Sequence, residues 1–203
     1  MWVPSENEEI ELELNVELWC RLGRLAIIQD TPPMFKVALY CADTSLKNGD
    51  SKIKNKQYMQ IPVTRLRWYA VAQALYGEAL YKLLDTKKQE KDSQDKLLHA
   101  SVARLVESCN IASKAKIGYL VLESSKSMWN SMIGILDAPN NRRLLVDPMC
   151  KMHSHLLAVQ ENSDPDFLTL FYTALFQVIA EQKDWKTGER IVDEAFKYMP
   201  QTH

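Results

Sequence analysis

The sequence predicts an all-α fold, a solenoid of about eight helices arranged as four antiparallel hairpins. Apolar residues recur at spacings of three and four along most of the chain, which is the helical period, and almost no segment alternates at a spacing of two. The six glycines fall mostly inside these periodic segments, whereas prolines and polar runs separate them. We therefore expect helices joined by short polar turns.

Composition places the chain among ordinary globular proteins and excludes several function classes. Of its 203 residues, 46% are hydrophobic and 25% are charged, which is enough apolar material for a sizeable core. The formal net charge of -1 predicts neither nucleic acid nor an anionic membrane as a partner. No apolar run approaches the roughly 20 residues that a membrane-spanning helix needs.

The four cysteines are scattered without a CxxC spacing, and the N-terminus does not have the pattern of a secretory signal. We therefore expect reduced thiols and a location in the cytoplasm.

The first predicted hairpin covers residues 16–48. It follows an acidic lead, residues 1–15, in which glutamate recurs. One helix is expected over 16–29 and ends at Asp30-Thr31-Pro32-Pro33, because proline removes backbone donors and fixes φ. A second helix is expected over 34–46.

The second predicted hairpin covers residues 63–115. Its first helix is expected from Val63 or Thr64 to Leu84, where apolar residues keep the helical spacing without interruption. Residues 85–95 mix both charges without apolar anchors and indicate a solvated connector. The return helix is expected over 94–115.

The third and fourth predicted hairpins cover residues 116–160 and 165–200. In the third, helices are expected over 116–136 and 140–160, and Pro148 predicts a break near Asp147. In the fourth, Asp164 and Pro165 have the pattern of a helix start. A final helix lies within the segment DWKTGERIVDEAFKYMP, residues 184–200.

The fourth hairpin matches most of the tetratricopeptide pattern of about 34 residues, in which large residues of one helix fill grooves beside small residues of the next. Phe176 departs from the pattern, because glycine or alanine usually stands there, and it predicts a wider helix crossing. The predicted packing residues of this hairpin are Tyr172, Leu175, Trp185, Gly188, Ala195 and Pro200.

The other hairpins follow the pattern less closely, and a closed helical bundle is the competing arrangement. The predicted packing residues in the first hairpin are Trp19, Leu22, Gly23, Ala38 and Ala42. Those in the second and third are Trp68, Ala72, Leu75, Gly77 and Trp129. The tryptophans could instead anchor a partner, but their helical core positions favour packing within the chain.

No residue pattern indicates catalysis or a cofactor. Cys150, His153 and His155 are the one cluster with metal-binding groups, but on a helix Cys150 and His153 share a face whereas His155 points elsewhere, and a structural zinc site needs four ligands. We expect packing and surface histidines. The chain has no glycine-rich phosphate loop and no GxSxG segment. The sequence therefore predicts a protein that is not an enzyme and holds no metal or cofactor.

The segments VELWCRLGRLAIIQD, RLRWYAVAQALYGEAL and SMWNSMIGIL followed by NRRLL resemble the repetitive helical body of the very large cilia- and flagella-associated proteins. These proteins scaffold the central apparatus of motile cilia. The resemblance implies a non-enzymatic scaffold in a central-pair projection of the axoneme, needed for the assembly and beating of cilia and sperm flagella. It also implies a hetero-complex with other axonemal projection proteins, near tubulin and calmodulin-containing subcomplexes.

The alternative function is a soluble tetratricopeptide adaptor, such as a chaperone or trafficking cochaperone. Such an adaptor binds a C-terminal carboxylate through Lys, Arg and Asn residues repeated at matching helix positions. These residues do not recur between the first and fourth hairpins. The chain stops directly after Pro200 while apolar residues of the last helix remain available, so we also expect it to be a fragment of a longer solenoid.

Overall fold

The computed structural model describes residues 6–47, 57–85, 87–136 and 139–198. Eight α-helices lie in these ranges: α1 (Glu6–Ile28), α2 (Pro32–Lys47), α4 (Val63–Lys82), α5 (Lys91–Lys114), α6 (Gly118–Leu136), α7 (Val146–Val159), α8 (Pro165–Glu181) and α9 (Trp185–Tyr198). Short 3-10 helices span Tyr58–Gln60 and Pro139–Leu145. The described residues contain no β-strand. The predicted all-α fold is confirmed.

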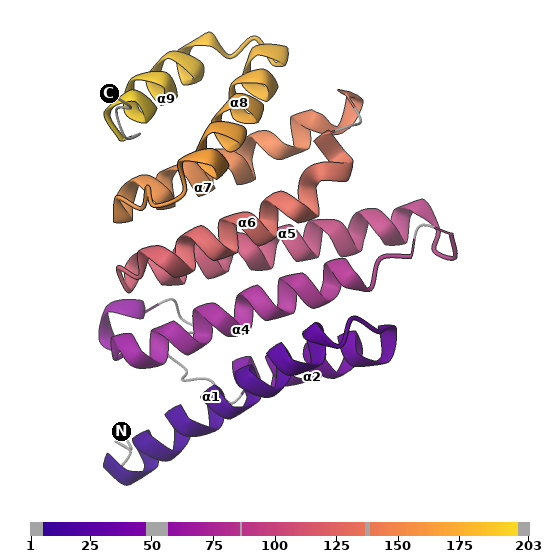
Figure 1. Cartoon of the computed structure of the whole chain (residues 1–203), viewed down its shortest axis with the longest axis vertical. Coiled ribbons are helices and arrows are strands. Elements are labelled where there is room, and N and C mark those ends of the chain that lie inside the picture. The colour runs from indigo at the N-terminus through magenta and orange to yellow at the C-terminus, as the bar shows by residue number, and fades with distance from the viewer. Residues whose placement is uncertain (1–5, 48–56, 86, 137–138, 199–203) are drawn as a thin grey trace.

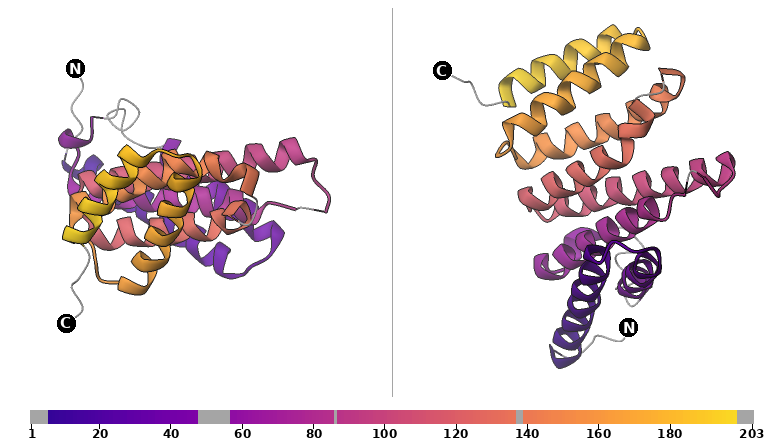
Figure 2. Two further views of the ribbon diagram at one scale, coloured as in Figure 1. Left: turned by 90° about the horizontal axis from the view of Figure 1, so that it is seen from above. Right: turned by 45° about the vertical axis from the view of Figure 1, so that its right-hand side comes forward.

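The helices are stacked in chain order along the long axis of the molecule as antiparallel pairs (Figure 1). Helices that follow one another along the chain pack together, and α1 also contacts α4, α4 contacts α6, and α5 contacts α7. Helices α1 and α9 lie at opposite ends of the stack, as Figure 1 and the right view of Figure 2 show. The chain therefore forms an open stack of helical hairpins, and the competing closed bundle is wrong.

Helix α4 is the most enclosed element of the stack. Twelve of its twenty residues are buried, because α1 and α2 pack on one side and α5 and α6 on the other. Its sequence lacks the polar face of a surface helix.

The seam between α4 and α5 is too narrow for a side chain at Gly77. A Cβ atom there would lie 2.7 Å from Cγ of Leu105 and 2.9 Å from the carbonyl oxygen of Ser101. The Ser101 hydroxyl donates a hydrogen bond of 2.8 Å to the Gly77 carbonyl, and the Ser108 hydroxyl donates one of 2.7 Å to the Ala70 carbonyl. Two serines of α5 thus bond the backbone of α4 directly, which is possible only at close approach.

Two predicted boundaries are wrong at helix N-termini. Helix α1 begins at Glu6, so the acidic lead is largely helical. Glutamate is a good helix former, and its charge interacts favourably with the N-terminal end of the helix dipole. Helix α5 begins at Lys91 inside the predicted connector, whose described part is a turn in which Asp85 accepts hydrogen bonds from the backbone N–H groups of Lys87 and Lys88.

Several helices end at a left-handed residue that is not glycine. Lys116, Gln160 and Lys183 have φ values of 55°, 54° and 57°. At the last of these, the backbone N–H of Asp184 donates to the carbonyl of Ile179 at 3.3 Å, the six-residue bond of a Schellman ending. Because no glycine occupies these positions, glycine in the sequence does not indicate where these helices end.

Gly77→Ala should lower the free energy of unfolding by about 1–3 kcal/mol, because the new methyl group would collide with backbone as well as with Leu105. Urea denaturation measures the change. Gly188→Ala is the matched control: its Cβ would meet only Cγ2 of Ile179, at 3.3 Å, and alanine favours the helix by about 1 kcal/mol. Equal losses of unfolding free energy in the two variants would contradict the close approach of α4 and α5 at Gly77.

Candidate functional site

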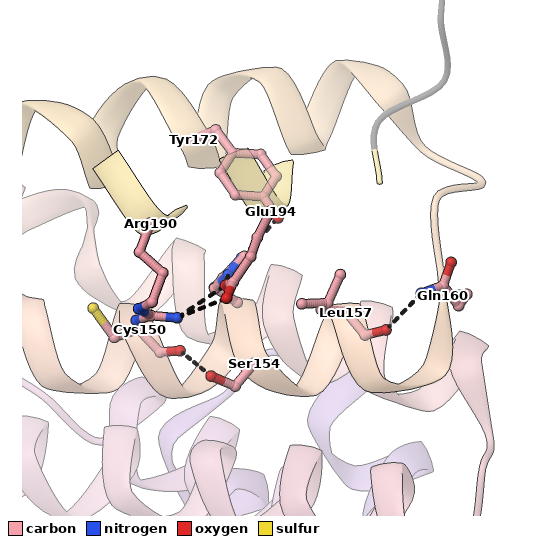
Figure 3. Close-up of polar contacts among 8 residues, drawn as sticks. Cys150, Ser154, Leu157, Gln160, Tyr172, Arg190 and Glu194 are labelled. Atoms are coloured by element: carbon pink, nitrogen blue, oxygen red, sulfur yellow. Dashed lines mark hydrogen bonds and ion pairs between the residues drawn. The ribbon is translucent and has the colours of Figure 1, made fainter. Parts of the chain in front are cut away.

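A buried polar cluster joins the last three helices (Figure 3). His153 of α7 has no exposed surface. Its Nδ1 atom lies 2.9 Å from the Tyr172 hydroxyl of α8, and its Nε2 atom lies 2.8 Å from a Glu194 oxygen of α9. Arg190 donates to both carboxylate oxygens of Glu194, at 3.1 and 2.9 Å. We call these four residues the histidine cluster.

One arrangement of protons satisfies the core of the histidine cluster. The Nε2 atom of His153 donates to Glu194, and the Nδ1 atom accepts the hydroxyl proton of Tyr172. The hydrogen bond from His153 is the main cause that lowers the pKa of Glu194, and burial raises the pKa of Tyr172. The carboxyl is therefore ionised and the phenol protonated at neutral pH.

The histidine cluster contains a carboxylate, an imidazole and a hydroxyl in a row, and the imidazole and the hydroxyl are buried. Tyr172 is 2% exposed, and its ring packs edge-on against that of His153 with centroids 5.7 Å apart. The cluster is best explained as a bond between hairpins that fixes α8 and α9 onto α7.

The other two residues with metal-binding groups are not members of the histidine cluster. Cys150 and His155 are half-buried, and burial is the main cause that lowers the pKa of His155 and raises that of Cys150. Within the described ranges, no group of three or more His, Cys, Asp or Glu side chains could hold a metal ion. His153 is a packing histidine, with both ring nitrogens engaged.

Buried thiols and hydroxyls elsewhere are structural too. Burial raises the pKa of Cys20 to about 11 and that of Cys109 to about 12, so neither is a nucleophile at neutral pH. Ser124 bonds Ser108 across the contact of α5 and α6 at 2.7 Å, and Ser125 donates to the Val121 carbonyl.

A groove of about 390 Å³ separates α5 from the 3-10 segment and α7. Its apolar walls include Leu98, Val102, Val106, Leu144 and Pro148. Lys151 and Asp147 at the rim form an ion pair of 2.6 Å with one another. The groove is long enough along α5 to hold side chains of a partner helix, which insert at spacings of three and four.

Large apolar side chains are exposed on both terminal helices of the stack. On α9 they are Trp185, 67% exposed, and Phe196, 75% exposed, which we call the α9 face. On α1 we define the α1 face as Ile10, Leu14, Leu18, Leu22, Leu25 and Ile28. The contiguous apolar surface of the α1 face is of the kind that typically marks an interaction site, and exposed aromatic rings such as those on α9 are enriched at interfaces.

Most of the predicted packing residues that the structure describes lie inside. Buried ones are Gly23, Ala38, Ala42, Ala72, Leu75, Gly77, Tyr172, Leu175 and Ala195. Trp19, Trp68, Trp129 and Gly188 are half-buried, and Pro200 lies outside the described residues. Trp19 packs edge-on against Tyr40, and Trp129 against Phe167.

Two of the packing predictions are wrong. Trp185 lies at the start of α9 with its side chain 67% exposed, and the half-buried Phe176 stacks on Tyr172 within α8 at a centroid distance of 6.0 Å. Leu22 faces away from the core because the other side of α1, with Val16, Cys20 and Gly23, is the buried one.

Comparisons with known proteins add no relative. No protein-family model matches the chain, and no curated protein matches it significantly. In the part of the chain that the structure describes, none of the helices combines the length and apolar character needed to cross a bilayer.

His153→Ala should lower the free energy of unfolding by about 2–4 kcal/mol, because it leaves the buried Tyr172 hydroxyl without its acceptor and opens a cavity. Denaturant titration measures the loss, and hydrogen exchange should locate it in α8 and α9. His99→Ala is the control, because His99 is exposed on α5. A loss spread evenly over the whole stack would contradict a bond that holds the last hairpin.

Glu194→Gln should destabilise the protein at pH 7 and not at acid pH. A carboxyl whose folded pKa is lowered adds stability above its unfolded pKa and loses it as the pH falls through the folded pKa. The side chain is 31% exposed, so we expect about 0.5–1 kcal/mol. The melting temperatures of the unmodified protein and of Glu194→Gln, measured between pH 7 and pH 3, should converge at the acid end. A constant difference across this range would contradict ionisation of Glu194 as the origin of the effect.

Proposed function

We propose that this chain is a non-enzymatic scaffold of the motile-cilium axoneme, in a projection of the central apparatus. Support for the scaffold comes from one observation above all: the open stack presents large apolar faces at its ends while its buried polar groups bond helices to one another. Support for the cilium comes from the three segments that resemble cilia- and flagella-associated proteins.

The partners that fit this proposal are other axonemal projection proteins. The groove beside α5 and the α9 face both present apolar side chains, which suits packing between helical proteins. Through such contacts the chain would contribute to the assembly and beating of cilia and sperm flagella. Tubulin and calmodulin-containing subcomplexes would lie nearby.

The groove gives less support to the adaptor alternative. A clamp for a peptide carboxylate needs cations that are available to the ligand. Lys151, a cation in the groove wall, is already paired with Asp147. Its walls are otherwise mainly apolar, which suits a helix better than a charged chain end.

The tagged chain should label axonemes in multiciliated cells or sperm, as a line along the shaft. Phe196→Asp should weaken this signal, because a charge on the α9 face opposes burial against a partner. Thr173→Asp on the exposed side of α8 is the control and should label normally. Circular dichroism checks that both variants fold. A diffuse cytosolic signal from the unmodified chain would contradict the ciliary proposal.

A further inference from the structure

Helix α1 carries apolar residues on two opposite sides. One side is buried against α2 and α4 through Val16, Cys20, Gly23 and Ala26. The other side is the α1 face, and five of its six side chains are more than half exposed. A helix that is apolar on both sides is normally covered on both, as α4 is in this stack.

The α1 face forms a continuous stripe. At 100° per residue, Ile10, Leu14, Leu18, Leu22, Leu25 and Ile28 fall within an arc of about 120°. The stripe runs along nearly the whole helix, which is 23 residues, or about 35 Å, long. Figure 1 shows α1 at the end of the stack, with no helix beyond it.

We propose that two copies of this chain associate through the α1 face, with the two α1 helices antiparallel about a two-fold axis near residues 19 and 20. In this register Ile10 of each copy faces Ile28 of the other, Leu14 faces Leu25, and Leu18 faces Leu22. All six apolar residues are thereby covered by the same six residues of the second copy, as an isologous interface requires.

The charges on α1 support a second copy as the occupant. Glu17 and Arg21 already form an ion pair of 2.6 Å within the helix, on one edge of the α1 face. A two-fold axis near residues 19 and 20 places Glu17 of each copy opposite Arg21 of the other. Four charges of alternating sign then border the apolar contact, so the register that covers the apolar residues also pairs the charges.

The length of the contact is adequate for a specific interface. Stable interfaces bury about 800 Å² of each partner, and the α1 face brings six large apolar side chains along about 35 Å of helix to such a contact. The helix pair also leaves the groove beside α5 and the α9 face accessible, because both lie farther along the stack (Figure 2). Self-association is therefore independent of the proposed ciliary role.

Sedimentation velocity of the full chain at about 10–100 μM tests the proposal. We expect a dimer, and Leu18→Glu should weaken it by at least tenfold in Kd, because two carboxylates would be buried near the axis. Leu170→Glu is the matched control, an equally exposed leucine on α8. A monomer throughout this range, or a dimer that Phe196→Glu dissociates and Leu18→Glu does not, would overturn the proposal.

Charge exchange tests the register. Arg21→Glu places Glu17 and the new carboxylate of the second copy opposite one another, and it should weaken the dimer. The double variant Glu17→Arg with Arg21→Glu restores both the internal and the intermolecular pairs and should recover it. Equal dimerisation by all three proteins would show that this edge of α1 lies outside the contact.

Cysteine crosslinking tests the direction of the helices. In a Cys150→Ser background the remaining native thiols are buried. Chains with Ile10→Cys should crosslink through a short bismaleimide to chains with Ile28→Cys after mixing, and neither variant should crosslink to itself. Self-crosslinking of Ile10→Cys would indicate parallel helices and overturn the antiparallel arrangement.

Discussion

The close approach of α4 and α5 at Gly77 is the constraint on which the stack depends. Helix α4 is buried on both sides, so its distance from α5 sets where the helices before and after it can lie. Ser101 and Ser108 of α5 donate hydrogen bonds to α4 carbonyls and so fix that distance. The α4 backbone donates none in return, because the N–H groups of a helix interior are already bonded within the helix. These hydrogen bonds can form because Gly77 has no Cβ atom to hold the two helices apart.

The sequence was sufficient for the number and pairing of helices because each helix has to bury a face, and the spacing of three and four records that face directly. It was insufficient where two properties of the same residues predict different structures. Glutamates at 6–13 indicate a solvated segment by charge and a helix by propensity, and the helix is what forms. Trp185 fits a packing position by spacing, but its side chain is exposed at the start of α9.

The histidine cluster could not have been found from spacing alone. Its members come from three helices, separated by 19 and 41 residues from His153, and no local pattern links them. A weak signal was present: a histidine on the apolar side of α7 needs two polar partners, and a tyrosine can supply a donor and a glutamate an acceptor. Which residues do so depends on how α8 and α9 pack against α7.

The two ends of the stack differ in a way that bears on how it assembles. At the α9 end, a polar bond through His153 closes the contact with α7, and the exposed apolar surface consists of separate aromatic rings. At the α1 end, the exposed surface is a regular aliphatic stripe with an ion pair at its edge. Isolated rings suit pockets in a different partner, whereas a regular stripe suits another helix of the same pattern. These differences favour the proposed association of two copies through α1, with a different partner at α9, over head-to-tail polymerisation.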